Sequence, residues 1–331
     1  MKKLWVFIVI AAISSLIGFG FAKFVFVGKT AVVGSRKAVD RSLDKYSIEN
    51  LSKTDIKPGK LTVDKDRDLF SFDFEPALDG KTASTSGQIY LPQKVGDSGK
   101  YPVVIMIRGY VDREIYKTGI GTSRAAGVFA RNGYITIAPD FLGYGNSSPE
   151  STNVFEARFQ TYTTILSLLK TIETPSFAEA TEGKWDGKNI FIWGHSNGGQ
   201  IALTVLEITG KNYPTSLWAP VSTPFPYSIL YFTDELSDYG KYLRGELAKF
   251  EADYDVGLYS IHTYYDRIQA PINLHQGIAD ESVPFKWSDA LAESLKGLGL
   301  KVNYYKYPQT DHNMTPSWNT AIGHDLEFFK K

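Results

Sequence analysis

The chain has 331 residues, with 36 basic and 36 acidic side chains and therefore a formal net charge of zero. This balance argues against a general nucleic-acid-binding protein, which usually carries a basic excess. The sequence contains no cysteine, which excludes disulfide bonds, thiolate metal sites and a cysteine nucleophile.

The first element in chain order is an apolar N-terminal segment. Two lysines precede nineteen residues without a charge, at positions 4–22. At about 1.5 Å per residue, a helix of this length just crosses a bilayer core of roughly 30 Å. We expect residues 1–28 to be a signal-anchor that holds the protein in a membrane, with the rest outside the cytoplasm. The alternative is a cleaved signal peptide and a secreted protein, because Gly20 and Ala22 offer small residues at a cleavage site.

The remainder divides into a polar stretch and one long domain. Residues 29–64 show no sustained hydrophobic period and predict a linker or stalk, whereas residues 65–331 predict a catalytic domain of the α/β class. Antiparallel strands come first and strands alternating with helices follow, which predicts a mostly parallel central sheet flanked by helices. Strands are expected at 68–76, 86–92, 101–109, 134–140, 189–195, 215–222, 271–277 and 302–308, and helices at about 120–132, 153–173, 197–209, 286–298 and 317–330.

One segment interrupts this alternation. Residues 223–268 are rich in Tyr, Phe, Asp and Glu and lie between two expected strands. We interpret them as a mainly helical insertion that caps the carboxyl edge of the sheet.

The run "IFIWGHSNGGQIAL" places a serine between a buried strand and a helix. A turn this tight leaves little room for side chains two residues before and two residues after the serine. Gly194 and Gly198 meet that need, and with Ser196 they form the Gly-x-Ser-x-Gly pattern of a nucleophile elbow. The helix that follows directs the backbone N–H of Asn197 and its positive dipole end toward an oxyanion formed at the serine.

A serine nucleophile needs a base, and the best candidate is His312. It lies in the polar loop "YPQTDHNM", directly after the last expected strand, from where it can reach the serine. His195 lies within the turn itself and is expected to face away from the base position. His275 lies in a buried strand and is expected to be a hydrogen-bonded core residue.

The base in turn needs a carboxylate to orient it. Asp280, in "HQGIADESVP", comes first at the carboxyl end of the penultimate strand, and Asp311, next to His312, is the alternative. Asp280 gives the chain order Ser196, Asp280, His312, which is the order of an α/β-hydrolase.

These motifs resemble a known family. "GHSNGG", "HQGIADESVP" and "YYKYPQTDHNM", together with "PDFLGYGNS" at 139–147, are similar to the catalytic domain of the prolyl oligopeptidase family of α/β-hydrolases. The resemblance covers about residues 86–330. It implies that Tyr110, in the loop after "VVIMI", offers its hydroxyl as a second oxyanion-hole donor beside the N–H of Asn197; packing under the cap is the alternative role for this tyrosine.

The sequence therefore predicts a serine hydrolase that needs neither a metal nor an organic cofactor. A peptidase acting on small peptides is the first expectation from the resemblance. A carboxylesterase acting on small or lipid-like esters is the second, because the chain shows no room for the family's β-propeller between the apolar segment and the first strand. A non-catalytic hydrolase fold that serves as a binding module is a third possibility. The sequence leaves the oligomeric state open.

Overall fold

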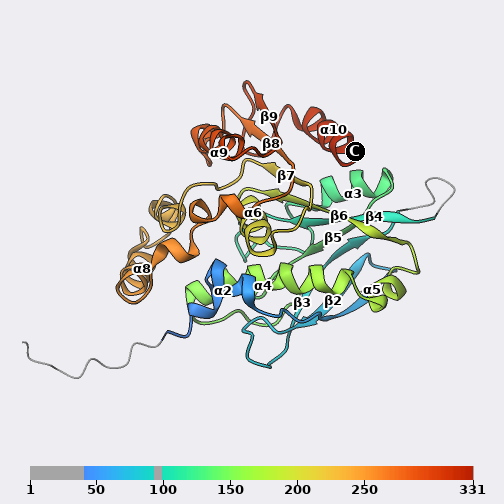
Figure 1. Ribbon diagram of the computed structural model, residues 1–331, viewed down its shortest axis with the longest axis horizontal. Helices are drawn as coiled ribbons and strands as arrows, with labels where there is room; N and C mark the ends of the chain where they lie inside the picture. Colours follow the sequence, from blue (N-terminus) through green and yellow to red (C-terminus); the bar gives the residue numbers. More distant parts are fainter. Residues whose placement is uncertain (1–40, 93–98, 331) are drawn as a thin grey trace, which may run out of the picture. The chain divides into compact units, whose positions relative to one another are not determined.

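The structure is a computed structural model that describes residues 41–92 and 99–330 (Figure 1). Within these two ranges, no helix combines the length and the apolar character that a bilayer crossing requires. The apolar segment at 4–22 lies outside the described residues, so the membrane anchor and the signal peptide both stay predictions.

A nine-stranded sheet forms the centre of the folded body, in the order β1-β2-β3-β5-β4-β6-β7-β8-β9. The pairs β1-β2, β2-β3 and β3-β5 are antiparallel. The remaining neighbours, β5-β4, β4-β6, β6-β7, β7-β8 and β8-β9, are parallel. The predicted mostly parallel sheet is confirmed. The strands are β1 (Lys60–Asp64), β2 (Leu69–Phe74), β3 (Ala83–Tyr90), β4 (Tyr101–Ile107), β5 (Ile135–Pro139), β6 (Trp185–His195), β7 (Thr215–Trp218), β8 (Ile272–Gly277) and β9 (Val302–Tyr307).

Helices cover both faces of the sheet, as the unbroken apolar strands predict. In β4, Val103 and Ile105 pack into one hydrophobic cluster and Val104 and Met106 into the other, because successive side chains point to opposite faces. Figure 1 shows α3 and α10 on one side of the central strands and α2, α4 and α5 on the other. The α-helices outside the insertion are α2 (Ile48–Lys53), α3 (Ser123–Arg131), α4 (Val154–Ile172), α5 (Pro175–Ala180), α6 (Asn197–Thr209), α9 (Phe285–Gly297) and α10 (Trp318–Phe329).

Residues 41–64 belong to this folded body, although the sequence predicts a linker over residues 29–64. They form the 3₁₀ turn η1 (Asp44–Tyr46), the helix α2 and the edge strand β1. The segment is short, and exposed polar residues separate its buried apolar ones, so it shows no period that sequence analysis could detect.

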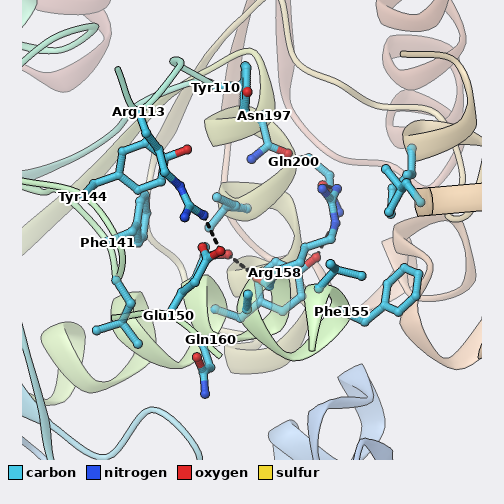
Figure 2. A pocket seen from close by; sticks show the side chains of 18 of the residues that line it. Tyr110, Arg113, Phe141, Tyr144, Glu150, Phe155, Arg158, Gln160, Asn197 and Gln200 are labelled. Atoms are coloured by element: carbon cyan, nitrogen blue, oxygen red, sulfur yellow. Dashed lines mark hydrogen bonds and ion pairs between the residues drawn. The ribbon is translucent and has the colours of Figure 1, made fainter. Parts of the chain in front are cut away.

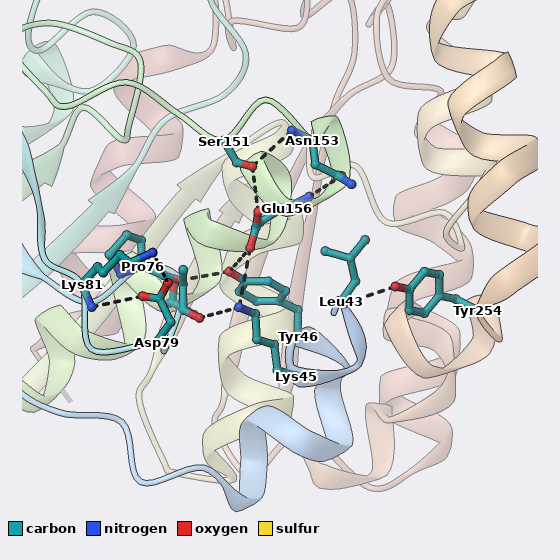
Figure 3. Close-up of polar contacts among 12 residues, drawn as sticks. Leu43, Lys45, Tyr46, Pro76, Asp79, Lys81, Ser151, Asn153, Glu156 and Tyr254 are labelled. Atoms are coloured by element: carbon teal, nitrogen blue, oxygen red, sulfur yellow. Dashed lines mark hydrogen bonds and ion pairs between the residues drawn. The ribbon is translucent and has the colours of Figure 1, made fainter. Parts of the chain in front are cut away.

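Specific contacts hold this N-terminal segment to two distant parts of the chain (Figure 3). The hydroxyl of the fully buried Tyr46 donates to Glu156 Oε1 of α4 at 2.9 Å. The backbone N–H of Leu43 donates to the hydroxyl of Tyr254 at 3.3 Å. Tyr254 directly follows helix α8 (Lys241–Asp253) of the insertion. The segment therefore ties the insertion to the body of the domain.

The predicted insertion at residues 223–268 is helical, but only one of its helices is long. The rings of Phe225, Phe250 and Tyr259 pack against Phe159 of α4, with ring centroids 6.3, 6.1 and 5.0 Å away. These contacts fix the insertion beside the carboxyl ends of the parallel strands. Its elements are α7 (Tyr227–Leu230), η2 (Thr233–Glu235), α8 (Lys241–Asp253), η3 (Val256–Tyr259), η4 (Ile261–Thr263) and η5 (Tyr265–Arg267).

Candidate active site

Ser196 occupies the turn between β6 and α6. Its backbone has φ 56° and ψ −121°, a conformation that costs energy for any residue with a Cβ and is typical of a nucleophile elbow. A Cβ on Gly194 would lie 2.6 Å from the carbonyl oxygen of Gly198, and a Cβ on Gly198 would lie 2.1 Å from that of Ile107. The turn therefore requires glycine at both positions that the sequence singles out.

The loops after β8 and β9 bring Asp280 and His312 together. Nδ1 of His312 lies 2.9 Å from Oδ2 and 3.1 Å from Oδ1 of Asp280, whose side chain is fully buried. The backbone N–H groups of Ser282 and Val283 also donate to Oδ1, at 2.9 and 2.8 Å. Burial raises the pKa of Asp280, but the hydrogen bond from His312 and these two N–H groups outweigh burial and lower it below its usual value. Asp280 is therefore ionised at neutral pH.

The alternative carboxylate, Asp311, is used within its own loop. Its Oδ1 accepts hydrogen bonds from the N–H groups of Asn313 and Thr315, at 2.9 and 2.8 Å. The structure thus pairs His312 with Asp280 and not with its sequence neighbour.

His195 supports the loop that carries His312, a contact that the sequence analysis missed. Its Nε2 lies 2.9 Å from the backbone carbonyl oxygen of His312, and the two ring centroids are 4.7 Å apart. Burial, followed by the neighbouring His312 ring, lowers the pKa of His195 to about 4. His195 is consequently neutral near pH 7, and its Nε2–H donates to that carbonyl.

The two atoms between which a proton would be transferred, Ser196 Oγ and His312 Nε2, form no hydrogen bond with the described residues. The N–H of Asn197 is the first of α6 and has no acceptor within the helix. No group of three or more His, Asp or Glu residues in the described ranges is placed to hold a metal ion.

The loop after β4 passes directly against the serine. A Cβ on Gly109 would lie 2.9 Å from Ser196 Cβ, so this position also admits only glycine. The next residue, Tyr110, is 69% exposed, and its hydroxyl donates to Asp112 Oδ1 at 2.8 Å. That hydrogen bond, together with burial, raises the pKa of Tyr110 to about 12. In this structure the Tyr110 hydroxyl is therefore hydrogen-bonded to Asp112, and its role as an oxyanion donor stays a prediction of the resemblance.

Arg108 fixes the orientation of this loop. Its Nη1 donates to the carbonyl oxygen of Gly109 at 2.9 Å, and its Nη2 donates to that of Asp140 at 2.7 Å. The guanidinium lies over the rings of Tyr144 and Tyr116, 4.1 and 4.6 Å from their centroids. In a trans peptide the C=O and N–H point in opposite directions. Arg108 therefore directs the N–H of Tyr110 away from itself.

Two cavities of about 390 Å³ each adjoin the turn. We call them the outer cavity, which contains Ser196, and the inner cavity, which contains Gln200 and Gln160. Figure 2 shows the inner cavity with Asn197 and Tyr110 near one end and Gln160 at the other. Residues 229, 236 and 243 of the insertion line both cavities, and its role as a cap stays a prediction. The residues that line both are Tyr110, Arg158, Asn197, Ile229, Leu236 and Leu243.

The family is decided by a match over residues 122–331 to the model of the prolyl oligopeptidase family. This chain belongs to the prolyl oligopeptidase family. The matched range includes Ser196, Asp280 and His312 and spans more than half of the chain. The protein is therefore a serine hydrolase, either a peptidase or a carboxylesterase. No curated protein matches the chain.

Solved structures with a similar fold include two esterases and a peptidase. Est1E from Butyrivibrio proteoclasticus, with ferulic acid bound, aligns at 18% identity and a TM-score of 0.54, over 76% of this chain and 96% of its own. A puromycin-hydrolysing peptidase of Mycobacterium tuberculosis aligns at 17% and 0.55, over 76% of this chain but only 37% of its own. Esterase Est2 of Thermogutta terrifontis, bound to propionate, aligns at 16% and 0.52, over 84% and 96%. Identities this low show the shared α/β-hydrolase fold alone.

Proposed function

We propose that Ser196, His312 and Asp280 form a catalytic triad that hydrolyses acyl compounds through an acyl-enzyme. The observation that carries this proposal is the strained turn at Ser196, next to a His312–Asp280 pair whose Nε2 has no partner in the described parts of the chain. Catalytic hydrogen bonds are often loose without substrate, so the absence of a Ser196–His312 bond is compatible with the triad.

In the first step, Ser196 Oγ forms a bond to the substrate carbonyl carbon while His312 Nε2 takes the hydroxyl proton. The tetrahedral intermediate then expels the leaving group, which receives that proton from His312. Water attacks the acyl-enzyme in the same way, giving a proton to His312 and releasing the acid and the free serine. Asp280 holds the Nδ1–H tautomer and stabilises the imidazolium that forms twice in the cycle.

The oxyanion needs two donors, and the first is the N–H of Asn197. For the second, the close passage of Gly109 and the anchoring by Arg108 favour the backbone N–H of Tyr110 over its hydroxyl, which is bound to Asp112. If the backbone donates, Tyr110→Phe leaves kcat nearly intact, whereas Arg108→Met lowers it by up to about 100-fold. The reverse result would assign the hydroxyl.

Peptide cleavage is our first choice of reaction, because the chain belongs to a family named for peptidases. Ester cleavage is the second, favoured by a specific observation. The chain aligns with 96% of the length of both Est1E and Est2, but with 37% of the puromycin-hydrolysing peptidase.

The deciding experiment compares a p-nitrophenyl ester with the p-nitroanilide of the same acyl group, using the full chain and Ser196→Ala as control. Hydrolysis of both compounds that is lost in Ser196→Ala would support a peptidase. Hydrolysis of the ester alone would support a carboxylesterase. No serine-dependent hydrolysis of either would contradict the proposal and favour a binding module.

A further inference from the structure

Arg158 places a guanidinium between the two cavities beside the proposed nucleophile. It extends from α4, lines both cavities and is half-buried. Its Nη2 donates to Gln200 Oε1, and Nε2 of Gln200 donates to the Tyr162 hydroxyl at 3.1 Å. Figure 2 shows Arg158 and Gln200 side by side in the inner cavity. This chain of hydrogen bonds holds the guanidinium in place beside both cavities.

No carboxylate in the described part of the chain pairs with this guanidinium. The Nε atom of Arg158 is buried and has no hydrogen-bond partner in those residues, and its one side-chain bond goes to a neutral amide. A buried charge without a counter-ion is costly, and an arginine fork matches a carboxylate in geometry. The guanidinium therefore lines both cavities with its charge not balanced by any carboxylate of the described residues.

The other charged groups around the cavities are accounted for elsewhere. In the inner cavity, Arg113 forms an ion pair with Glu150. In the outer cavity, Asp112 and Glu235 are exposed at the rim, where solvent and salt screen them. Asp112 additionally accepts the Tyr110 hydroxyl. Arg108, which also lines the inner cavity, donates through Nη1 and Nη2 to two backbone carbonyl oxygens. Arg158 is the charged side chain that lines both cavities, and it forms no ion pair within the described residues.

The position of the base indicates which part of the substrate meets Arg158. The leaving group must lie near His312, which returns a proton to it. His312 lines neither cavity, whereas Ser196 and Asn197 line the outer one. The part of the substrate that enters the cavities is therefore the acyl part, on the oxyanion side of the serine.

We propose that Arg158 binds a carboxylate on the acyl part of the substrate, so that the enzyme prefers acidic acyl groups. Such a group is an acidic side chain of a peptide or the distal carboxylate of a dicarboxylic acid monoester. The proposal rests on the proposed function of the same site, and it adds the substrate class.

The test uses two p-nitrophenyl esters, which a peptidase and an esterase would both cleave. Mono-p-nitrophenyl adipate carries a free carboxylate, and its methyl ester has the same shape without the charge. The full-length protein is compared with Arg158→Met, with Arg158→Lys, and with Arg131→Met, which removes an exposed arginine of α3 away from both cavities. Ser196→Ala gives the background rate, and thermal melting confirms that each variant is folded.

We expect the wild-type protein to have a higher kcat/KM for the charged ester than for the neutral one. Arg158→Met should lower kcat/KM for the charged ester by about 10- to 100-fold, as loss of a hydrogen bond to a charged group does. The neutral ester should be unaffected, Arg158→Lys should keep part of the preference, and Arg131→Met should change neither rate. No preference in the wild type, or an equal loss on both esters in Arg158→Met, would overturn the inference while leaving the hydrolase intact.

A binding measurement decides the inference even if neither ester is cleaved, an outcome that would count against the proposed function. Adipate should raise the melting temperature of the wild-type protein and of Ser196→Ala, but not that of Arg158→Met. An equal effect of adipate on all three proteins, or no effect on any, would contradict the proposal. Hydrolysis of the p-nitroanilides of acetyl-glutamate and acetyl-glutamine is then compared. Faster cleavage of the glutamate compound would identify a peptide side chain as the source of the carboxylate, and cleavage of neither would favour a dicarboxylic acid monoester.

Discussion

Two histidine–aspartate pairs in the described part of the domain have nearly the same hydrogen-bond distance but different surroundings. His312 Nδ1 lies 2.9 Å from Asp280 Oδ2, and His275 Nε2 lies 2.8 Å from Asp325 Oδ1. Both pairs involve β8 or the loop that follows it. The first lies at the carboxyl edge of the sheet, whereas the second lies under α10 with both side chains fully buried.

The difference is whether a ring nitrogen is left open. The second ring nitrogen of His275 is bound to the Tyr307 hydroxyl at 2.8 Å, and Asp325 also accepts from Ser216 and from Trp218 Nε1, at 2.6 and 2.7 Å. In His312 only Nδ1 is used. A pair in which both ring nitrogens are hydrogen-bonded stabilises the fold. A pair with one unbound ring nitrogen beside a serine can accept a proton and return it.

The largest effect that distinguishes the pairs concerns the histidines. His312→Gln should reduce kcat by about a million-fold, because it removes the proposed base of a triad, with little change in melting temperature. His275→Gln, the matched change in the buried pair, should lower the melting temperature and leave the activity of the folded protein near that of the wild type. Steady-state kinetics and thermal melting of both variants check this. Equal activity losses would mean that the two pairs do not differ as described.

Asp280→Asn should be the next most damaging change. It preserves the shape of the side chain but removes the charge that fixes the His312 tautomer, so we expect kcat to fall by about 10⁴-fold. The measurement is single-turnover kinetics with a p-nitrophenyl ester. A loss of less than tenfold would assign the orienting role to another group.

Asp325→Asn should affect stability instead of catalysis. It leaves the buried donors of Ser216, Trp218 and His275 imperfectly paired, and leaving a buried hydrogen-bonding group unsatisfied costs roughly 1–3 kcal/mol. Denaturant unfolding would show the loss, and activity at a temperature where the variant is folded should be retained. Unchanged stability would show that this network can relax around an amide.

Glu207 differs from both aspartates, because its buried carboxyl group has no hydrogen-bond partner among the described residues. It is 1% exposed, neither oxygen is hydrogen-bonded among the described residues, and burial raises its pKa well above the usual value. The folded state therefore holds a proton on Glu207 that the unfolded chain releases. The free energy of unfolding is consequently highest, with respect to this group, below about pH 4.5, and it declines as the pH rises above that value.

Glu207→Gln should accordingly raise the free energy of unfolding at pH 7 by about 1–3 kcal/mol, with the gain shrinking toward pH 4.5. Thermal melting as a function of pH measures this. Glu293→Gln, a matched change at an exposed position of α9, should show no such dependence. A pH-independent effect of Glu207→Gln would show that this carboxyl does not titrate as described.

The sequence could predict what depends on local pattern. The buried strands, the glycines around Ser196 and the loops that carry Asp280 and His312 are all local features. The carboxyl ends of parallel strands then bring these loops to one edge of the sheet. The expected core role of His275 is confirmed for the same reason, because its strand is a continuous apolar run.

The features that escaped prediction depend on contacts between distant segments. His195 was expected to face away from the base position, and its contact with the backbone of His312, 117 residues later, was not predicted. Leu43 contacts Tyr254, which lies 211 residues away, and no pattern within residues 29–64 indicates that contact. Arg158 is one of several arginines in the sequence, and only the cavities around it distinguish it from the rest.

The most direct test of the central claim is labelling of the full chain with a fluorophosphonate, which reacts with an activated serine, followed by mass spectrometry of the peptides. The account predicts one adduct, on Ser196, that is absent in Ser196→Ala and strongly reduced in His312→Gln. No adduct, or an adduct on Ser196 that His312→Gln does not diminish, would contradict the proposed triad.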